Sequence, residues 1–219
     1  MLKRILNLFF PPKCVLCRKV LSDQQTDLCH ECRVETPDFP KANLKISFVA
    51  GWTALWYYKD KVRYSMLRFK FYNARSYADS YGRLLAMKLY RRPLGEFDVL
   101  TWVPVGSLRR WKRGYDQVEL IAHRVADELG IRPIATLKKQ RNTPQQSQLT
   151  TLAHRKANVL GAFRITDPEL VRGKRILLLD DIITTGATAS ELARVLLTAG
   201  AKEVYVAAVA AAVHDKKDR

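Results

Sequence analysis

The segment from Arg175 to Thr188, RILLLDDIITTGAT, constrains the fold of this chain more than any other. Its residues 176–179 are an unbroken apolar run, which is typical of a strand buried on both faces of a parallel sheet. Asp180 and Asp181, here called the acidic pair, follow where we expect that strand to end. Beyond the next turn, apolar residues recur at intervals of three and four, which predicts a helix that stops near Gly200.

The turn between the predicted strand and helix suits one phosphate group. Open α/β sheets bind ligands beyond the carboxyl ends of their strands, and a helix N-terminus offers amide donors and a favourable dipole to an anion. Thr184, Thr185 and Thr188 add hydroxyl donors, and Gly186 permits close approach of the backbone. Because the acidic pair repels a phosphate, we expect it to bind a vicinal diol instead. Phosphate and diol together predict a ribose 5-phosphate. The interpretation fails if these acids point into solvent or are locked to lysines, with no cavity beside the threonines.

The stretch DDIITTGAT closely resembles the ribose-phosphate signature of the type I phosphoribosyltransferases. The wider chain resembles their ComF/GntX-like competence branch. This resemblance implies an α/β fold with a Rossmann-like parallel sheet, a small N-terminal four-cysteine zinc element and a helical region. It also implies that phosphoribosyl pyrophosphate, together with Mg²⁺, contacts a run of motif residues. These are Asp180, Asp181, Ile182, Thr184, Thr185, Gly186, Ala187 and Thr188.

In a transferase of this class the sugar ring becomes positively charged, so the resemblance implies a catalytic role for Asp180 and Asp181 in stabilising that charge. A Walker B strand is also apolar and ends in an acid. It requires a glycine-rich loop ending in Gly-Lys-Ser/Thr, which this sequence lacks. No GxGxxG motif follows a strand either. A buried strand with an ordinary acidic end remains the structural alternative.

Residues 97–105, FDVLTWVPV, predict the first strand of the core. In the resembling family the loop after this strand contacts pyrophosphate, which implies a role for the amides of Gly106 and Ser107 and for the Arg109 guanidinium. Gly106 stands where the family commonly has a second proline. The following RGYDQ resembles the family's RGxNQ and predicts a helix to Leu129, with Asp116 and Gln117 either capping that helix or serving the ligand.

Residues 131–137 predict a second core strand, and a long polar segment, 138–156, follows it. A segment of this length inside a compact domain is usually functional or disordered. Its position matches the lid of phosphoribosyltransferases, and this match implies a ligand contact from Arg141. The sequence GAFRI at 161–165 predicts a third strand, and residues 203–211 predict a last buried strand.

The chain carries 38 lysine and arginine residues against 21 acidic residues, a formal net charge of +17. Such an excess favours anionic partners, nucleic acid first. Residues 59–92 interleave basic and aromatic side chains, as single-strand binders do, although two amphipathic helices with structural aromatics give the same pattern. The candidate contacts to single-stranded DNA are Arg63, Arg68, Lys70, Arg75, Arg110, Lys112, Arg113 and Arg155.

All four cysteines lie near the start of the chain, as two CxxC pairs separated by eleven residues. This spacing is typical of one tetrahedral zinc, and four thiolates close its coordination, so the metal is expected to be structural. Disulfides are the weaker alternative in a reducing compartment. The predicted ligands are Cys14, Cys17, Cys29 and Cys32, with His30 expected to be a surface residue.

We expect an N-terminal helix and a zinc-ribbon-like module with four cysteine ligands at 1–45, a basic and aromatic region at 46–95, a phosphoribosyltransferase-like core at 96–213 and a solvated tail at 214–219. The first residues imitate a signal peptide, but Pro11 and Pro12 interrupt the short apolar stretch. The longest late apolar run is about half a membrane span. These features predict a cytoplasmic protein without membrane insertion.

Two functions remain open. The resemblance implies a ComF-like protein that binds phosphoribosyl pyrophosphate and Mg²⁺, binds single-stranded DNA and acts in DNA uptake during natural transformation, with a helicase-like DNA translocase as partner. The alternative is an active phosphoribosyltransferase that acts on an unidentified base or amine acceptor and has no direct DNA role.

Overall fold

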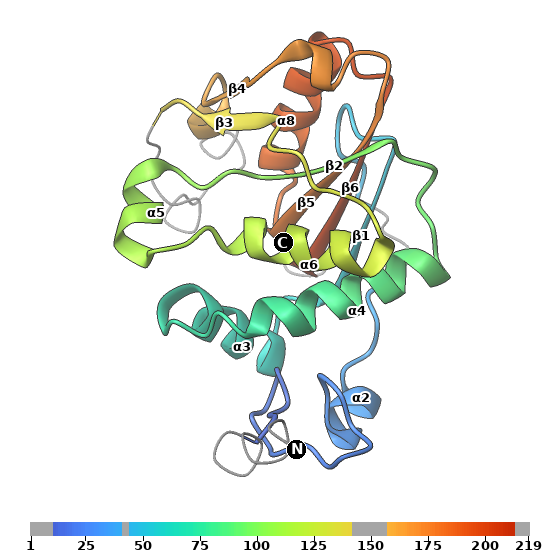
Figure 1. Ribbon diagram of the computed structural model, residues 1–219, viewed down its shortest axis with the longest axis vertical. Helices are drawn as coiled ribbons and strands as arrows, with labels where there is room; N and C mark the ends of the chain where they lie inside the picture. Colours follow the sequence, from blue (N-terminus) through green and yellow to red (C-terminus); the bar gives the residue numbers. More distant parts are fainter. Residues whose placement is uncertain (1–10, 41–43, 142–156, 213–219) are drawn as a thin grey trace, which may run out of the picture.

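The computed structural model describes residues 11–40, 44–141 and 157–212. The centre of the molecule is a four-stranded parallel sheet (Figure 1). In pairing order, its strands are β1 (Gly51–Tyr57), β6 (Glu203–Ala211), β5 (Arg175–Ile183) and β2 (Val99–Trp102). The predicted N-terminal helix, most of the predicted lid with Arg155, and the tail lie outside the described residues.

Helices cover both faces of this sheet. The bounds are α2 (His30–Glu35), α3 (Asp60–Phe71), α4 (Tyr77–Arg91), α5 (Ser107–Arg113), α6 (Gln117–Leu129) and α8 (Ala187–Thr198), with a 3₁₀ turn, η2, at Pro168–Leu170. On β5, Leu177 and Leu179 pack with α3, α4 and α6, whereas Ile176 and Leu178 pack with α8. This alternation confirms a strand buried on both faces. Among the described helices, none has both the length and the apolar character needed to cross a membrane.

The prediction of a core strand at 131–137 is wrong. Residue Pro133 makes one isolated parallel bridge to Leu100 of β2, and the strand that forms, β3 (Leu137–Lys139), pairs antiparallel with β4 (Phe163–Ile165) in a separate two-stranded sheet. A proline has no N–H to donate to a ladder, so pairing with β2 does not propagate past this bridge. The predicted third strand is β4, and it therefore also lies outside the main sheet.

Residues 51–57, within the basic and aromatic region expected at 46–95, form β1, an edge strand of the main sheet. It runs parallel to β6, the last strand of the chain, with Gly51 opposite Tyr205 and Tyr57 opposite Ala211. The region before residue 95 therefore contributes a strand to the sheet as well as two helices to its face.

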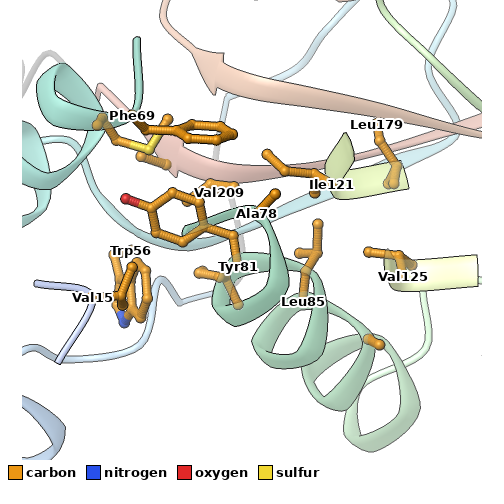
Figure 2. Close-up of a cluster of buried hydrophobic side chains, with 14 of the residues drawn as sticks. Val15, Trp56, Phe69, Ala78, Tyr81, Leu85, Ile121, Val125, Leu179 and Val209 are labelled. Carbon is orange, nitrogen blue, oxygen red and sulfur yellow. The ribbon is translucent and has the colours of Figure 1, made fainter. Parts of the chain in front are cut away.

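Tyr81 of α4 lies at the centre of the helical side of the core (Figure 2). It is fully buried, with its ring centroid 5.4 Å from that of Phe69 and 6.3 Å from that of Trp56. Its hydroxyl lies 2.6 Å from the Ser65 hydroxyl, and Ser65 donates to the carbonyl of Val15. Burial raises the pKa of Tyr81, so the phenol stays neutral and this buried polar chain is fully paired.

The zinc element, residues 11–40, packs beneath α3 and α4, at the opposite end of the molecule from β3 and β4 (Figure 1). Its Asp27 side chain, 5% exposed, accepts from Arg83 of α4, whose Nε lies 3.1 Å from each carboxylate oxygen. The Leu16 carbonyl accepts a hydrogen bond from a second guanidinium, that of Arg68 on α3. An ion pair to α4 and a charge-assisted hydrogen bond from α3 therefore attach the zinc element to both helices.

We expect Asp27→Ala to lower the free energy of unfolding by about 1–3 kcal/mol, because it leaves the half-buried Arg83 guanidinium without its carboxylate partner. The matched control is Glu31→Ala, which removes an ion pair to Lys19 whose side chains are 56% and 59% exposed. That change should cost less than Asp27→Ala, because both groups of the pair are exposed to solvent. Urea unfolding of the zinc-loaded protein, followed by circular dichroism, measures both. Equal losses in the two variants would contradict the assigned role of Asp27.

Candidate functional site

The acidic pair lies inside the second half of β5, not after the strand as the sequence predicted. The ladder with β6 continues to Ile183, opposite Ala211, and carries Asp180 and Asp181 into the sheet. Asp180 is 8% exposed, and its Oδ1 accepts a 2.7 Å bond from the Asp181 amide. The two carboxylates therefore sit at the carboxyl edge of the sheet, where open α/β folds bind ligands.

The environments of the two acids differ. The pKa of Asp180 is raised to about 7, chiefly by burial and next by the charge of Asp181, while the ammonium of Lys70 acts in the opposite direction. Asp181 forms an ion pair with that same lysine, with 2.7 Å between Nζ and Oδ2. This pair departs from the expectation that neither acid is engaged by a lysine. The carboxylate of Asp181 thus has a protein partner before any ligand arrives.

The threonine turn that follows β5 ends at Gly186, the residue that caps α8. Gly186 has φ +74°, and a Cβ at this position would lie 2.8 Å from the side chain of Ile46. Glycine is therefore favoured at this position by the left-handed backbone and by the close approach of the Ile46 side chain. The Ala187 amide donates to the Thr185 hydroxyl at 3.4 Å. The turn leads into the helix N-terminus predicted to receive a phosphate, with Thr184 and Thr188 half-buried beside it.

The loop after β2 lies beside the acidic pair, because β2 and β5 are neighbouring parallel strands with Trp102 opposite Leu179. The predicted turn at Gly106 and Ser107 is the start of a short helix, α5, with Gly106 as its N-cap. Arg109 lies on this helix, and its side chain is outside the described part of the structure. The predicted pyrophosphate loop and the acidic pair thus share one edge of the sheet.

Asp116 fixes this loop. One of its carboxylate oxygens accepts from the amides of Val118 and Glu119 at 3.0 and 3.2 Å, which confirms the predicted cap of α6. Its other oxygen accepts from the Val105 amide at 2.9 Å, a contact that the sequence did not reveal. Burial raises the pKa of Asp116, and the three amide donors oppose that shift. RGYDQ therefore positions the loop as well as starting the helix.

The basic residues predicted to contact nucleic acid divide into two groups. Arg68 turns inward, donating to Tyr77 Oη at 3.1 Å as well as to the zinc element, and Lys70 is paired with the acidic pair. The exposed members, as far as their side chains are described, are Arg63, Arg75 and Arg110. Lys112 and Arg113 belong to α5, but their side chains are not described.

Arg141 donates to the carbonyls of Leu160 and Asn158, at 3.0 and 3.4 Å. These bonds tie the chain just after β3 to the segment that precedes β4. The predicted contact of Arg141 with a ligand stays a prediction.

Three exposed aromatics neighbour the exposed arginines in the sequence. Phe71 and Tyr72 at the end of α3 are 54% and 76% exposed, and Trp111 on α5 is 80% exposed. The loop after α3 approaches the C-terminal end of α5, because a Cβ on Gly114 would lie 2.9 Å from the guanidinium of Arg75. The sequence did not single out Trp111, although a tryptophan inside the run RRWKR was the available signal.

The four cysteines converge on one point. Their sulfur atoms all lie within 4.8 Å of one another, with 3.6 Å between those of Cys17 and Cys29. Tetrahedral zinc with Zn–S bonds of about 2.3 Å places sulfurs about 3.8 Å apart, whereas a disulfide needs about 2.05 Å. The donor set and its spacing fit zinc. His30 is exposed and is not among the clustered ligands, as expected.

We expect one zinc per chain by metal analysis, and we expect Cys32→Ser to abolish stoichiometric binding because it opens the closed tetrahedron. His30→Ala should keep the metal, since that side chain is only an exposed neighbour. Removing zinc with a chelator should unfold the element at 11–40 and lower the melting temperature. A zinc content unchanged in the Cys32 variant would overturn the assignment.

Comparisons with known proteins agree with this architecture. A family model described as phosphoribosyl transferase domain matches residues 119–219, and a double zinc ribbon domain matches residues 5–43. Competence protein F of Haemophilus influenzae is 26% identical over 223 residues, which cover 90% of this chain and 96% of that protein. The predicted fold class is thereby established, with its parallel sheet and its N-terminal zinc ribbon.

The DNA utilization protein YhgH of Salmonella typhi is 37% identical over 110 residues, half of this chain. The chain spans about half the length of that relative, 47%. Among solved structures, glutamine phosphoribosylpyrophosphate amidotransferase from B. subtilis shares 28% identity, covers 61% of this chain and 26% of its own, and has a TM-score of 0.41. A superposition of that quality carries no argument about individual site residues.

Proposed function

Because the chain belongs to the ComF-like competence family of phosphoribosyltransferase-fold proteins, we propose that it binds phosphoribosyl pyrophosphate with Mg²⁺ and single-stranded DNA, and acts in DNA uptake. One observation supports the proposed binding of the sugar phosphate. The acidic pair, the threonine turn at the start of α8 and the loop after β2 meet at one edge of the sheet. We place this role in the cytoplasm, where thiols stay reduced for zinc.

At this edge each group of the proposed ligand has a matching partner. The amides of the first turn of α8 and the threonine hydroxyls bind the 5-phosphate, and the acidic pair accepts hydrogen bonds from the ribose hydroxyls. The amides of Gly106 and Ser107, with Arg109, hold the pyrophosphate. Mg²⁺, when bound, supplies charge to the pyrophosphate and ribose oxygens. If transfer occurs, Asp180 and Asp181 stabilise the positive charge of the sugar ring.

We expect Asp180→Asn and Asp181→Asn each to weaken binding of phosphoribosyl pyrophosphate and Mg²⁺ about tenfold to a hundredfold, because a charged acceptor of a hydroxyl is lost. Isothermal titration calorimetry measures the affinity. The control is Glu169→Gln, which neutralises an exposed carboxylate paired with Arg172. Wild-type affinity in both aspartate variants would reject this site, and pyrophosphate release on adding one base would favour the transferase alternative.

The proposed DNA surface consists of Phe71, Tyr72, Arg75, Arg110 and Trp111, here called the α3–α5 surface. Its rings are exposed, so bases can stack on them, and its arginines supply charge for the backbone. The guanidinium carbon of Arg75 lies 4.6 Å from the centroid of the Tyr115 ring, which holds the arginine in place. A net charge of +17 adds attraction for a polyanion.

We expect Tyr72→Ala and Trp111→Ala each to weaken binding of a fluorescent oligothymidine about fivefold to a hundredfold, since a stacked base is worth about 1–3 kcal/mol. Tyr90→Ala is the matched control: Tyr90 is 84% exposed but lies near the far end of α4 (Figure 1). Fluorescence anisotropy at two salt concentrations measures the affinity and its salt dependence. An equal loss in the Tyr90 variant would show that this surface has no special role.

The resemblance to competence proteins also leads us to propose a helicase-like DNA translocase as the protein partner. Co-purification of the two tagged proteins, with and without single-stranded DNA, tests this partner directly.

A further inference from the structure

Lys70 forms an ion pair that is largely shielded from solvent. Its Nζ lies 2.7 Å from Asp181 Oδ2, and the two side chains are only 20% and 17% exposed. The pair joins α3 to β5, two elements far apart in the sequence. A lysine gives up side-chain entropy and hydration to enter such a place. The arrangement therefore calls for an explanation beyond surface charge.

The backbone of Lys70 is fixed by the residues that follow the pyrophosphate loop. Tyr115 Oη donates to the Phe69 carbonyl at 2.7 Å, and Gln117 Nε2 lies 3.5 Å from the Lys70 carbonyl. Phe69 itself is fully buried in the core of the helical layer. The last turn of α3 is thus held at two successive carbonyls, and the lysine stem extends from a fixed point towards the acidic pair.

We infer that Lys70 is a positioning residue of the sugar-phosphate site: its ammonium holds the Asp181 carboxylate beside Asp180 in the orientation that receives a ribose hydroxyl. This inference rests on the proposed binding of a phosphoribosyl ligand. A carboxylate accepts about four hydrogen bonds, so Lys70 and one sugar hydroxyl can share Asp181. Lys70 therefore orients the acid and remains in place when the ligand binds.

The same contact favours the ionised form of Asp180. Asp180 is buried next to Asp181, whose negative charge opposes the ionisation of Asp180. Among the charged groups that act most strongly on Asp180, Lys70 is a cation, whereas Asp181 and Asp116 are acids. A protonated carboxyl offers one oxygen fewer as a charged acceptor, so the lysine also preserves the acceptor strength of the pair.

The test compares Lys70→Met with Lys61→Met in titrations with phosphoribosyl pyrophosphate and Mg²⁺. Lys61 is on the same helix and has an ion pair of similar length, 2.6 Å to Glu35, but the side chains of that pair are 45% and 59% exposed. We expect about tenfold weaker binding in Lys70→Met and unchanged binding in Lys61→Met. Lys70→Arg, which keeps the charge, should restore most of the affinity.

Two further readouts separate positioning from a merely structural role. In an Asp181→Asn background, Lys70→Met should cause little additional loss, because the lysine acts through that acid. Binding in the Lys70→Met protein should also be lost at higher pH on acidification than in the wild type, since Asp180 loses the cation that favours its ionised form.

The inference is overturned if Lys70→Met binds the ligand as the wild type does while Asp181→Asn does not. It is also overturned if the losses from the two changes are additive, or if Lys70→Arg fails to restore binding. Retained affinity in Asp181→Asn itself would instead reject the proposed function, so the two failures are distinguishable.

Discussion

The pairing of β5 between β2 and β6 is the interaction on which the rest of the structure depends. All three strands are parallel, so their carboxyl ends meet at one edge, which is where open α/β folds bind ligands. The cost is the burial of Asp180 within the ladder. The Asp181 amide and the charge of Lys70 offset that cost. A site of opposite charges is therefore built into the sheet itself.

Elements with local start and stop signals were predictable from the sequence. Helix α6 begins after the cap at Asp116 and ends before Gly130, and β6 has the predicted bounds. The pairing of β3 was not predictable, because strand partners are chosen by tertiary contacts and a run of apolar residues does not specify them. Only the position of Pro133 hinted that residues 131–137 would leave the main sheet.

The acids and the turn of the candidate site were predictable from the sequence, but the cation that pairs with Asp181 was not. In the sequence, Lys70 is one basic residue among many in an interleaved aromatic region. Its pairing with Asp181 depends on how α3 packs against the sheet. Gly186 likewise matched the expected turn, yet the atom that approaches it belongs to Ile46. Sequence patterns specify residue types at an edge, whereas packing decides which of them meet.

The last turn of α3 shows how one short segment serves four parts of the molecule. Successive residues of a helix point about 100° apart, so four neighbours face different directions. Arg68 donates to the zinc element, Phe69 enters the core, Lys70 reaches the acidic pair, and Phe71 is exposed on the α3–α5 surface. A shift of this turn would therefore change the contacts at all of these places at once. The zinc element, by holding Arg68, supports the edge that carries the acidic pair.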